Sequence, residues 1–205
     1  MNHRVCPWWL GYVLVNPLRR WMHDPGAILG PFVSEGMVAL EPGPGMGFFT
    51  LELARLGARV VAGDISPGQL ELHAEKTASV ERSIESRELL DILDLSRFAD
   101  ASFDAVVCFG GPISYVLGEA DRALAELLRV TRPGGHVLLS VMSLIGTARA
   151  YFDQLLSLAE EFGWERAVTD IFATGDLDAE MNKGHVCRLY RWSSLEQLLG
   201  RSQRA

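Results

Sequence analysis

The chain has 205 residues, of which 48% are hydrophobic and 22% charged, an ordinary composition for a globular protein with room for one α/β domain. The net charge of −7 argues against nucleic-acid binding, and no apolar run reaches the ~18 residues that a transmembrane helix needs. Cys6, Cys108 and Cys187 stand far apart without a C-x-x-C motif, so we expect free thiols, no metal site and a reducing, cytoplasmic compartment.

Residues 1–36 are predicted to form an N-terminal helical cap. Asn16 and Asp24 each precede a proline, a pattern that starts helices. Short helices are expected near residues 8–15, 17–23 and 25–33. The apolar stretch Trp8–Val15 lacks a small-residue cleavage site, so it is interpreted as part of the mature fold rather than as a signal peptide. Its aromatic residues, including Tyr12, either pack the cap against the sheet or line a pocket.

The next segment, residues 38–47, reads V-A-L-E-P-G-P-G-M-G. It predicts a buried strand that ends at Glu41, a tight turn with three alternate glycines, and a helix over residues 47–56. Glycines let the backbone take positive φ and approach a ligand, and the helix N-terminus offers unpaired N–H groups. Phe48 replaces the third glycine of the dinucleotide fingerprint G-x-G-x-x-G, and Glu41 would repel a pyrophosphate. A ligand with a cationic end suits this turn better; a turn without any ligand is the alternative.

Residues 59–63 predict a second strand that ends at Asp64, 19 residues after Gly45. An acidic side chain at this place can accept hydrogen bonds from both hydroxyls of a ribose, and Ile65 can cover one face of an adenine. Asp64 could instead cap the next helix, predicted from Ser66 to about Lys76. Ser66 can serve as that cap equally well, so the ribose role is favoured.

A third strand is expected near residues 86–90, followed by the run L-D-I-L-D-L at 90–95. The continuous apolar run Phe103–Cys108 predicts a central parallel strand that is buried on both faces. It ends in the glycine turn F-G-G-P, at the edge where ligands of open α/β sheets bind.

The remaining elements are predicted from periodicity and from turn residues. They are an amphipathic helix over Glu119–Val130, a turn at Arg132–Gly135, a fifth strand over His136–Val141, a helix near 147–161, a strand at His185–Trp192, and a last helix over Ser194–Leu199 that Ser193 caps.

Four features occur in an order that resembles the class I S-adenosylmethionine-dependent methyltransferases. They are the turn E-P-G-P-G-M-G, the acidic end of strand two, an aspartate before strand four, and P-G-G before strand five. The resemblance covers residues 5–141 well and 185–199 weakly. It implies an α/β, Rossmann-like, doubly wound and mostly parallel sheet with helices on both faces. The class sheet has strand order 3-2-1-4-5-7-6, and strands six and seven are expected to be missing here. The cap, 1–36, and the methyltransferase region, 37–205, would form a single domain.

The resemblance also implies S-adenosylmethionine as the cofactor and assigns roles to residues. The glycine turn and Glu41 would hold the cationic end of this cofactor. Asp64 would bind its ribose, and the carbonyl of Cys108 would contact its methionine part. Aligning Leu95 with the leucine of the class motif gives Asp91 the adenine amino group in preference to Asp94, with the Ile92 N–H on the ring. The expected cofactor-binding residues are Glu41, Gly43, Gly45, Gly47, Asp64, Ile65, Asp91, Ile92 and Cys108.

The implied reaction transfers a methyl group to a small-molecule acceptor. Tyr12, Ser114 and Tyr115 are candidates to contact that acceptor. No catalytic residue is assigned; His23, His185 and Tyr115 are the candidate bases if the acceptor must lose a proton. The alternatives are a catalytically silent, S-adenosylmethionine-binding regulatory protein and, less favoured, a nucleotide-linked oxidoreductase. Neither a nucleic acid nor a membrane is an expected partner.

The edge of the sheet at strand five would expose unpaired backbone groups. We therefore expect either that residues 185–192 fold back against this strand, or that the chain forms a homodimer through the edge.

Overall fold

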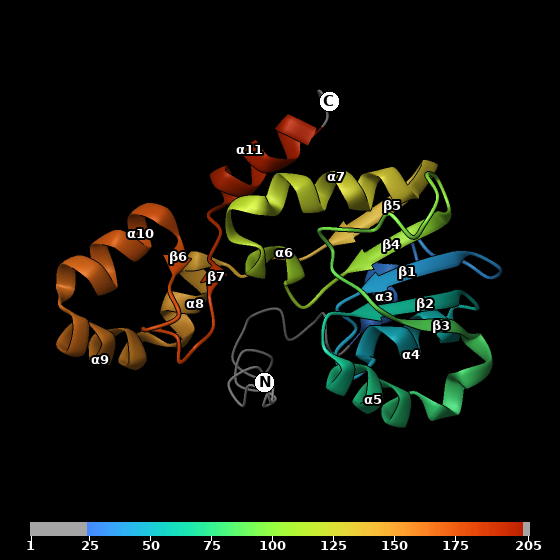
Figure 1. Ribbon diagram of the computed structural model, residues 1–205, viewed down its shortest axis with the longest axis horizontal. Coiled ribbons are helices and arrows are strands. Elements are labelled where there is room, and N and C mark those ends of the chain that lie inside the picture. The colour runs from blue at the N-terminus through green and yellow to red at the C-terminus, as the bar shows by residue number, and fades with distance from the viewer. Residues whose placement is uncertain (1–23, 203–205) are drawn as a thin grey trace.

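The computed structural model describes residues 24–202. Its centre is one five-stranded sheet in the order β3-β2-β1-β4-β5, with every neighbouring pair parallel (Figure 1). The strands are β1 (Val38–Pro42), β2 (Arg59–Asp64), β3 (Ile84–Leu89), β4 (Phe103–Cys108) and β5 (Thr131–Leu139). The order confirms the predicted Rossmann-like, doubly wound sheet through its first five strands.

Helices cover both faces of this sheet (Figure 1). One face carries α3 (Pro25–Leu29), α4 (Phe48–Arg55), α5 (Pro67–Lys76) and the short η1 (Ala78–Ser83). The other carries α6 (Pro112–Tyr115), η2 (Leu117–Glu119) and α7 (Ala120–Val130), and α11 (Trp192–Ser202) packs against α7 (Figure 1). Asp24 caps α3 by accepting a hydrogen bond from Ala27 N, as its place before Pro25 predicts.

Successive residues of the central strands contribute to two separate cores. In β1, Ala39 packs with Leu53 of α4, whereas Leu40 packs with Leu124 and Leu127 of α7. All of these side chains are buried, and a fully buried leucine contributes about 1.5–3 kcal/mol to folding. Because β1 and β4 are buried on both faces, their sequences are apolar without alternation, which is why the sequence identified them.

The segment after β5 forms a third, smaller core beside α6 (Figure 1). It contains α8 (Leu144–Ala150), α9 (Phe152–Phe162), the π-type turn η3 (Glu165–Asp170), α10 (Ile171–Thr174), and the antiparallel pair β6 (Asp176–Leu177) and β7 (Cys187–Arg188). The prediction of one helix over 147–161 was wrong, because the chain leaves helical geometry at Tyr151 (φ −124°, ψ 40°).

Residues 185–192 do not fold back along β5. Only β7 is strand, it pairs with β6, and Tyr190 exchanges hydrogen bonds with Met142 and Leu144, just beyond the end of β5. Within residues 24–202, β5 is therefore an edge strand, and self-association through it stays a prediction. The last helix begins at Trp192, one residue before the expected cap Ser193. No helix in the described part of the chain is long and apolar enough to span a bilayer.

Candidate cofactor site

The predicted ligand-binding turns meet at the carboxyl edge of the sheet. Gly43 N donates to the carbonyl of Gly63 at 2.7 Å, which joins the turn after β1 to the end of β2. Leu90 N donates to the carbonyl of Asp64 at 2.9 Å, which joins the end of β2 to the segment after β3. A Cβ atom added to Gly43 would lie 2.6 Å from Cγ of Pro112, so the turns after β1 and β4 touch.

The three glycines of the first turn have different surroundings. All take positive φ: 73° at Gly43, 54° at Gly45 and 80° at Gly47. A Cβ on Gly47 would lie 2.2 Å from Cγ2 of Thr77, so this glycine closes the turn against the protein. A Cβ on Gly45 would meet no atom of the described residues within 4 Å, and the same holds for Gly110 in the turn after β4. Gly45 and Gly110 therefore leave open space at the sheet edge, which a ligand can fill.

Glu41 is buried beneath this turn, with only 2% of its surface exposed. Its Oε2 accepts a hydrogen bond from Thr50 Oγ1 at 2.5 Å. Burial raises the pKa of Glu41 to about 8, while the hydrogen bond from Thr50 acts in the opposite direction. A buried carboxylate with so high a pKa is a favourable counter-charge for a cationic group, because a nearby positive charge offsets the cost of its desolvation. This donor set fits the cationic end of S-adenosylmethionine.

Asp64 lies at the end of β2 and is not the cap of α5. Ser66 Oγ accepts from Gln69 N at 3.4 Å and caps that helix, so the alternative role for Asp64 is excluded. Asp64 Oδ1 accepts from Ser66 N at 2.9 Å, and burial raises the pKa of its carboxyl group. Ile65 beside it is 70% exposed, so its apolar side chain presents a large open surface. Asp64 and Ile65 thus lie next to each other at the end of β2, and their contacts with a ribose and an adenine stay predictions.

The two aspartates after β3 differ in their surroundings. Asp91 Oδ1 accepts from Leu93 N at 2.9 Å, and Asp94 Oδ1 accepts from Ser96 N at 3.1 Å. Hydrogen bonds from Ser96 lower the pKa of Asp94, and Arg122 and Arg129 of α7 lower it further. Asp94 is thus oriented by the loop and by α7, which leaves Asp91 as the better candidate for the adenine. Ile92 between them is buried.

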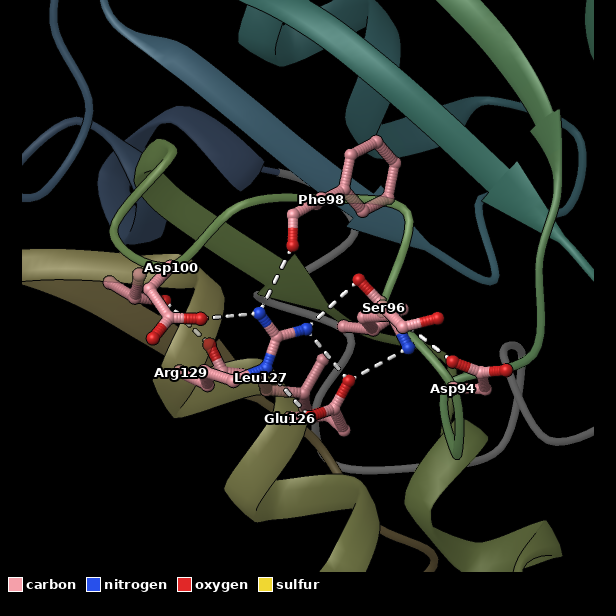
Figure 2. A network of polar contacts seen from close by, with 9 residues as sticks. Asp94, Ser96, Phe98, Asp100, Glu126, Leu127 and Arg129 are labelled. Atoms are coloured by element: carbon pink, nitrogen blue, oxygen red, sulfur yellow. Dashed lines mark hydrogen bonds and ion pairs between the residues drawn. The ribbon is translucent and has the colours of Figure 1, made fainter.

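Arg129 of α7 anchors the loop over residues 95–100, which follows the two aspartates (Figure 2). It donates to the carbonyls of Leu95 at 2.9 Å and Phe98 at 3.0 Å, and it pairs with Asp100 and Glu126. Glu126 in turn accepts from Leu95 N at 2.8 Å. These charge-assisted bonds fix the loop after Asp91 from one side, a role of α7 that sequence periodicity did not reveal.

The residues at the end of β4 are mainly structural. Burial raises the pKa of the Cys108 thiol to about 12, so it is no nucleophile, and its carbonyl accepts from Ser140 N at 3.1 Å. Ser114 is fully buried and accepts from Met142 N at 2.9 Å; the expectation that it faces an acceptor does not agree with this geometry, because its hydroxyl ties α6 to the chain after β5. Tyr115, by contrast, is 41% exposed.

The remaining candidates either lie away from this edge or fall outside the described residues. Tyr12, His23 and Cys6 lie outside the described residues, and His185 lies in the turn before β7, where its N–H donates to Asn182 O. Cys187 is a buried free thiol in the third core. Residues 24–202 hold no group of three or more His, Cys, Asp or Glu side chains that could bind a metal.

Sequence reasoning missed three residues that support Glu41. Thr50 Oγ1 lies 2.8 Å from Nε2 of His73, and Arg87 Nε donates to Nδ1 of the same histidine at 3.1 Å. The three belong to α4, α5 and β3, so no local pattern could have connected them.

Comparison with known proteins shows what this chain is similar to. Residues 40–139 match a family described as a methyltransferase domain. The chain is 39% identical over 108 residues to a demethylmenaquinone methyltransferase of Thermobifida fusca, covering 53% of this chain and 44% of the relative. It is 33% identical to a malonyl-[acyl-carrier protein] O-methyltransferase of Serratia marcescens, covering 53% and 39%. The matched part is thus less than half of either relative.

A solved structure from Methanosarcina mazei, described as a SAM-dependent methyltransferase, has the same fold. It superposes with a TM-score of 0.63 at 22% identity, covering 85% of this chain and 82% of the other. The matched region, 40–139, contains the glycine turn, Asp64, Asp91 and the end of β4. Residues 40–139 therefore carry a methyltransferase domain of the class I, S-adenosylmethionine-dependent type, and S-adenosylmethionine is the cofactor expected of it.

Proposed function

We propose that this chain is a cytoplasmic enzyme that transfers a methyl group from S-adenosylmethionine to a small-molecule acceptor. The observation that carries the proposal is the buried Glu41 in β1, followed by a turn in which Gly45 leaves open space among the described residues, at the edge where β1, β2 and β4 end. When bound, S-adenosylmethionine supplies an electrophilic methyl group on a positively charged sulfur.

The residues of the chain would bind and orient this cofactor. Glu41 offers a negative charge to its cationic end, and Asp64 offers carboxylate oxygens to the ribose hydroxyls. Asp91 would accept from the adenine amino group, with Ile92 N–H on the ring, and Ile65 would cover one face of the adenine. Methyl transfer needs mainly alignment of donor and acceptor and exclusion of water, so a site without an evident base is compatible with it.

The acceptor would approach from the side of Tyr115, whose side chain is exposed at the end of β4 and α6. A cavity of about 240 Å³ in the third core is lined by Leu117 and residues of 166–186, but by none of the glycine turn. It is therefore separate from the cofactor site. The names of the relatives give two acceptor classes to try first, quinone-like rings and carboxylates on a carrier.

The test has two stages. Calorimetric titration with S-adenosylmethionine and with S-adenosylhomocysteine measures binding, and incubation with methyl-labelled cofactor and pools of acceptors measures transfer. Saturable binding with transfer to an acceptor supports the enzyme. Binding without transfer to any pool supports the alternative of a catalytically silent cofactor-binding protein. A chain that binds neither compound contradicts both.

A further inference from the structure

A continuous line of hydrogen bonds leads from Glu41 to the outer strand of the sheet. Thr50 Oγ1 donates to Glu41 Oε2 at 2.5 Å, and His73 Nε2 lies 2.8 Å from the same hydroxyl oxygen. Arg87 Nε donates to His73 Nδ1 at 3.1 Å. Thr50 and His73 have no exposed surface, so water does not compete for these bonds.

Arg87 fixes which group donates and which accepts in each of these hydrogen bonds. A guanidinium group only donates, so Nδ1 of His73 must be the unprotonated acceptor and Nε2 must carry the proton. Nε2–H then donates to Thr50, and the single hydroxyl proton of Thr50 is directed to Glu41. Oε2 of Glu41 is therefore held as an acceptor. Burial lowers the pKa of His73 to about 4, which keeps its ring neutral as this order requires.

The same side chains are anchored on their other sides. Arg87 Nη2 donates to Thr77 Oγ1 at 3.0 Å and pairs with Glu81, and Thr77 Oγ1 donates to the carbonyl of His73 at 2.7 Å. A Cβ on Gly47 would lie 2.2 Å from Thr77 Cγ2 and 3.1 Å from His73 Cδ2. The hydrogen-bonded line thus also packs against the end of the glycine turn.

We propose that Thr50, His73 and Arg87 are positioning residues, which orient the Glu41 carboxylate for the cationic end of the cofactor. The inference rests on the proposed function, because it assumes that Glu41 lies in the cofactor site. The three residues act through Glu41, because they fix Oε2 as the oxygen that accepts the hydrogen bond from the Thr50 hydroxyl.

Three substitutions interrupt the line at different places. Thr50→Val keeps the shape of the side chain but removes the donor to Glu41, and affinity for S-adenosylmethionine should fall about tenfold or more, the effect of one hydrogen bond to a charged group. His73→Leu should have an effect of about fivefold, because Thr50 can then direct its proton elsewhere. Arg87→Met removes the group that selects the histidine tautomer, so a similar loss is expected.

Each substitution has a matched control. Thr50→Ser keeps the hydroxyl, and His73→Gln keeps an N–H donor near the position of Nε2, so both should bind more tightly than Thr50→Val and His73→Leu. Arg59→Met breaks a different ion pair to the same outer strand, with Glu85, and should leave affinity unchanged. Calorimetry gives the dissociation constants, and thermal unfolding without ligand shows whether each variant is folded.

A second readout gives its main result on the wild-type protein. The ¹⁵N NMR spectrum of the wild-type His73 ring should show the neutral Nε2–H tautomer, and Arg87→Met should shift it toward Nδ1–H. A wild-type Nδ1–H tautomer, or a wild type that binds S-adenosylmethionine no better than Thr50→Val and His73→Leu, would overturn the inference alone. A wild type that binds no S-adenosylmethionine would overturn the proposed function, and the inference with it.

Discussion

Gly43 lies directly against Pro112, so closely that a single added carbon atom would come within 2.6 Å of the proline ring. Through this contact the turn after β1 and the turn after β4 become one surface at the carboxyl edge of the sheet. Gly43 also takes a φ of 73°, which side-chain-bearing residues rarely adopt. The position needs glycine for the fold itself.

Gly43 and Gly45 should therefore respond differently to substitution. Gly43→Ala should lower the unfolding temperature by several degrees, because the clash and the backbone strain together cost roughly 1–3 kcal/mol. Gly45→Val puts a branched side chain into open space, so the strain at φ 54° costs some stability, but its main effect should be the loss of S-adenosylmethionine binding. Thermal unfolding and calorimetry on both variants separate the two roles. Normal binding by Gly45→Val would show that this turn is only structural.

Alanine substitutions of the three aspartates should weaken S-adenosylmethionine binding to different degrees. Asp64→Ala should weaken S-adenosylmethionine binding roughly 10- to 150-fold, because a hydrogen bond to a charged group contributes about 1.5–3 kcal/mol. Asp91→Ala should have a smaller effect. Asp94→Ala should have none, because that carboxylate is already engaged by Ser96 and faces the arginines of α7. If Asp94→Ala weakens binding more than Asp91→Ala does, the alignment of Leu95 that favours Asp91 is misplaced.

Cofactor binding should release a proton near neutral pH. The pKa of Glu41 is raised to about 8, so below that pH the free protein holds this carboxyl group largely protonated. A cationic ligand favours the charged form, so affinity should rise with pH, by up to about tenfold per unit, and level off above pH 8. Thr50 and, through it, His73 are the polar side chains that approach Glu41 in the described residues. Calorimetry in buffers of different ionisation enthalpy measures the proton, and Glu41→Gln should bind weakly and without this pH dependence.

His73 should make the fold sensitive to acid. Its pKa is lowered to about 4, from an ordinary value of 6.5, so the unfolded chain takes up a proton at this residue before the folded protein does. Its contribution to stability is present above pH 6.5 and is lost as the pH falls toward 4. The difference in unfolding temperature between wild type and His73→Leu should therefore shrink over this range. A difference that stays constant would mean that His73 is not buried in its neutral form.

The sequence predicted the sheet where local signals were strong. The limits of β4 agreed with its apolar run, and α5 began where Ser66 and Pro67 indicated. Beyond β5, the expected strand over 185–192 was reduced to Cys187–Arg188, because the partner of Tyr190 is the chain near Met142 rather than a strand edge. Pairing of that kind depends on tertiary contacts that alternation of residue types does not record.

In the candidate site, too, the residues that depend on tertiary packing could not be predicted from local sequence. Glu41, Gly45 and Asp64 follow from motif and spacing, because each ends a strand or forms the turn after it. Thr50 and His73 became evident only when α4 and α5 were packed on the same face of the sheet, since a buried threonine and a buried histidine have no sequence pattern of their own.

Titration of S-adenosylmethionine into the wild-type chain, with Gly45→Val and a nicotinamide dinucleotide as parallel experiments, tests the central claim most directly. We expect saturable binding at one site in the wild type, its loss in a folded Gly45→Val variant, and no binding of the dinucleotide. Tight dinucleotide binding in the absence of S-adenosylmethionine binding would contradict it.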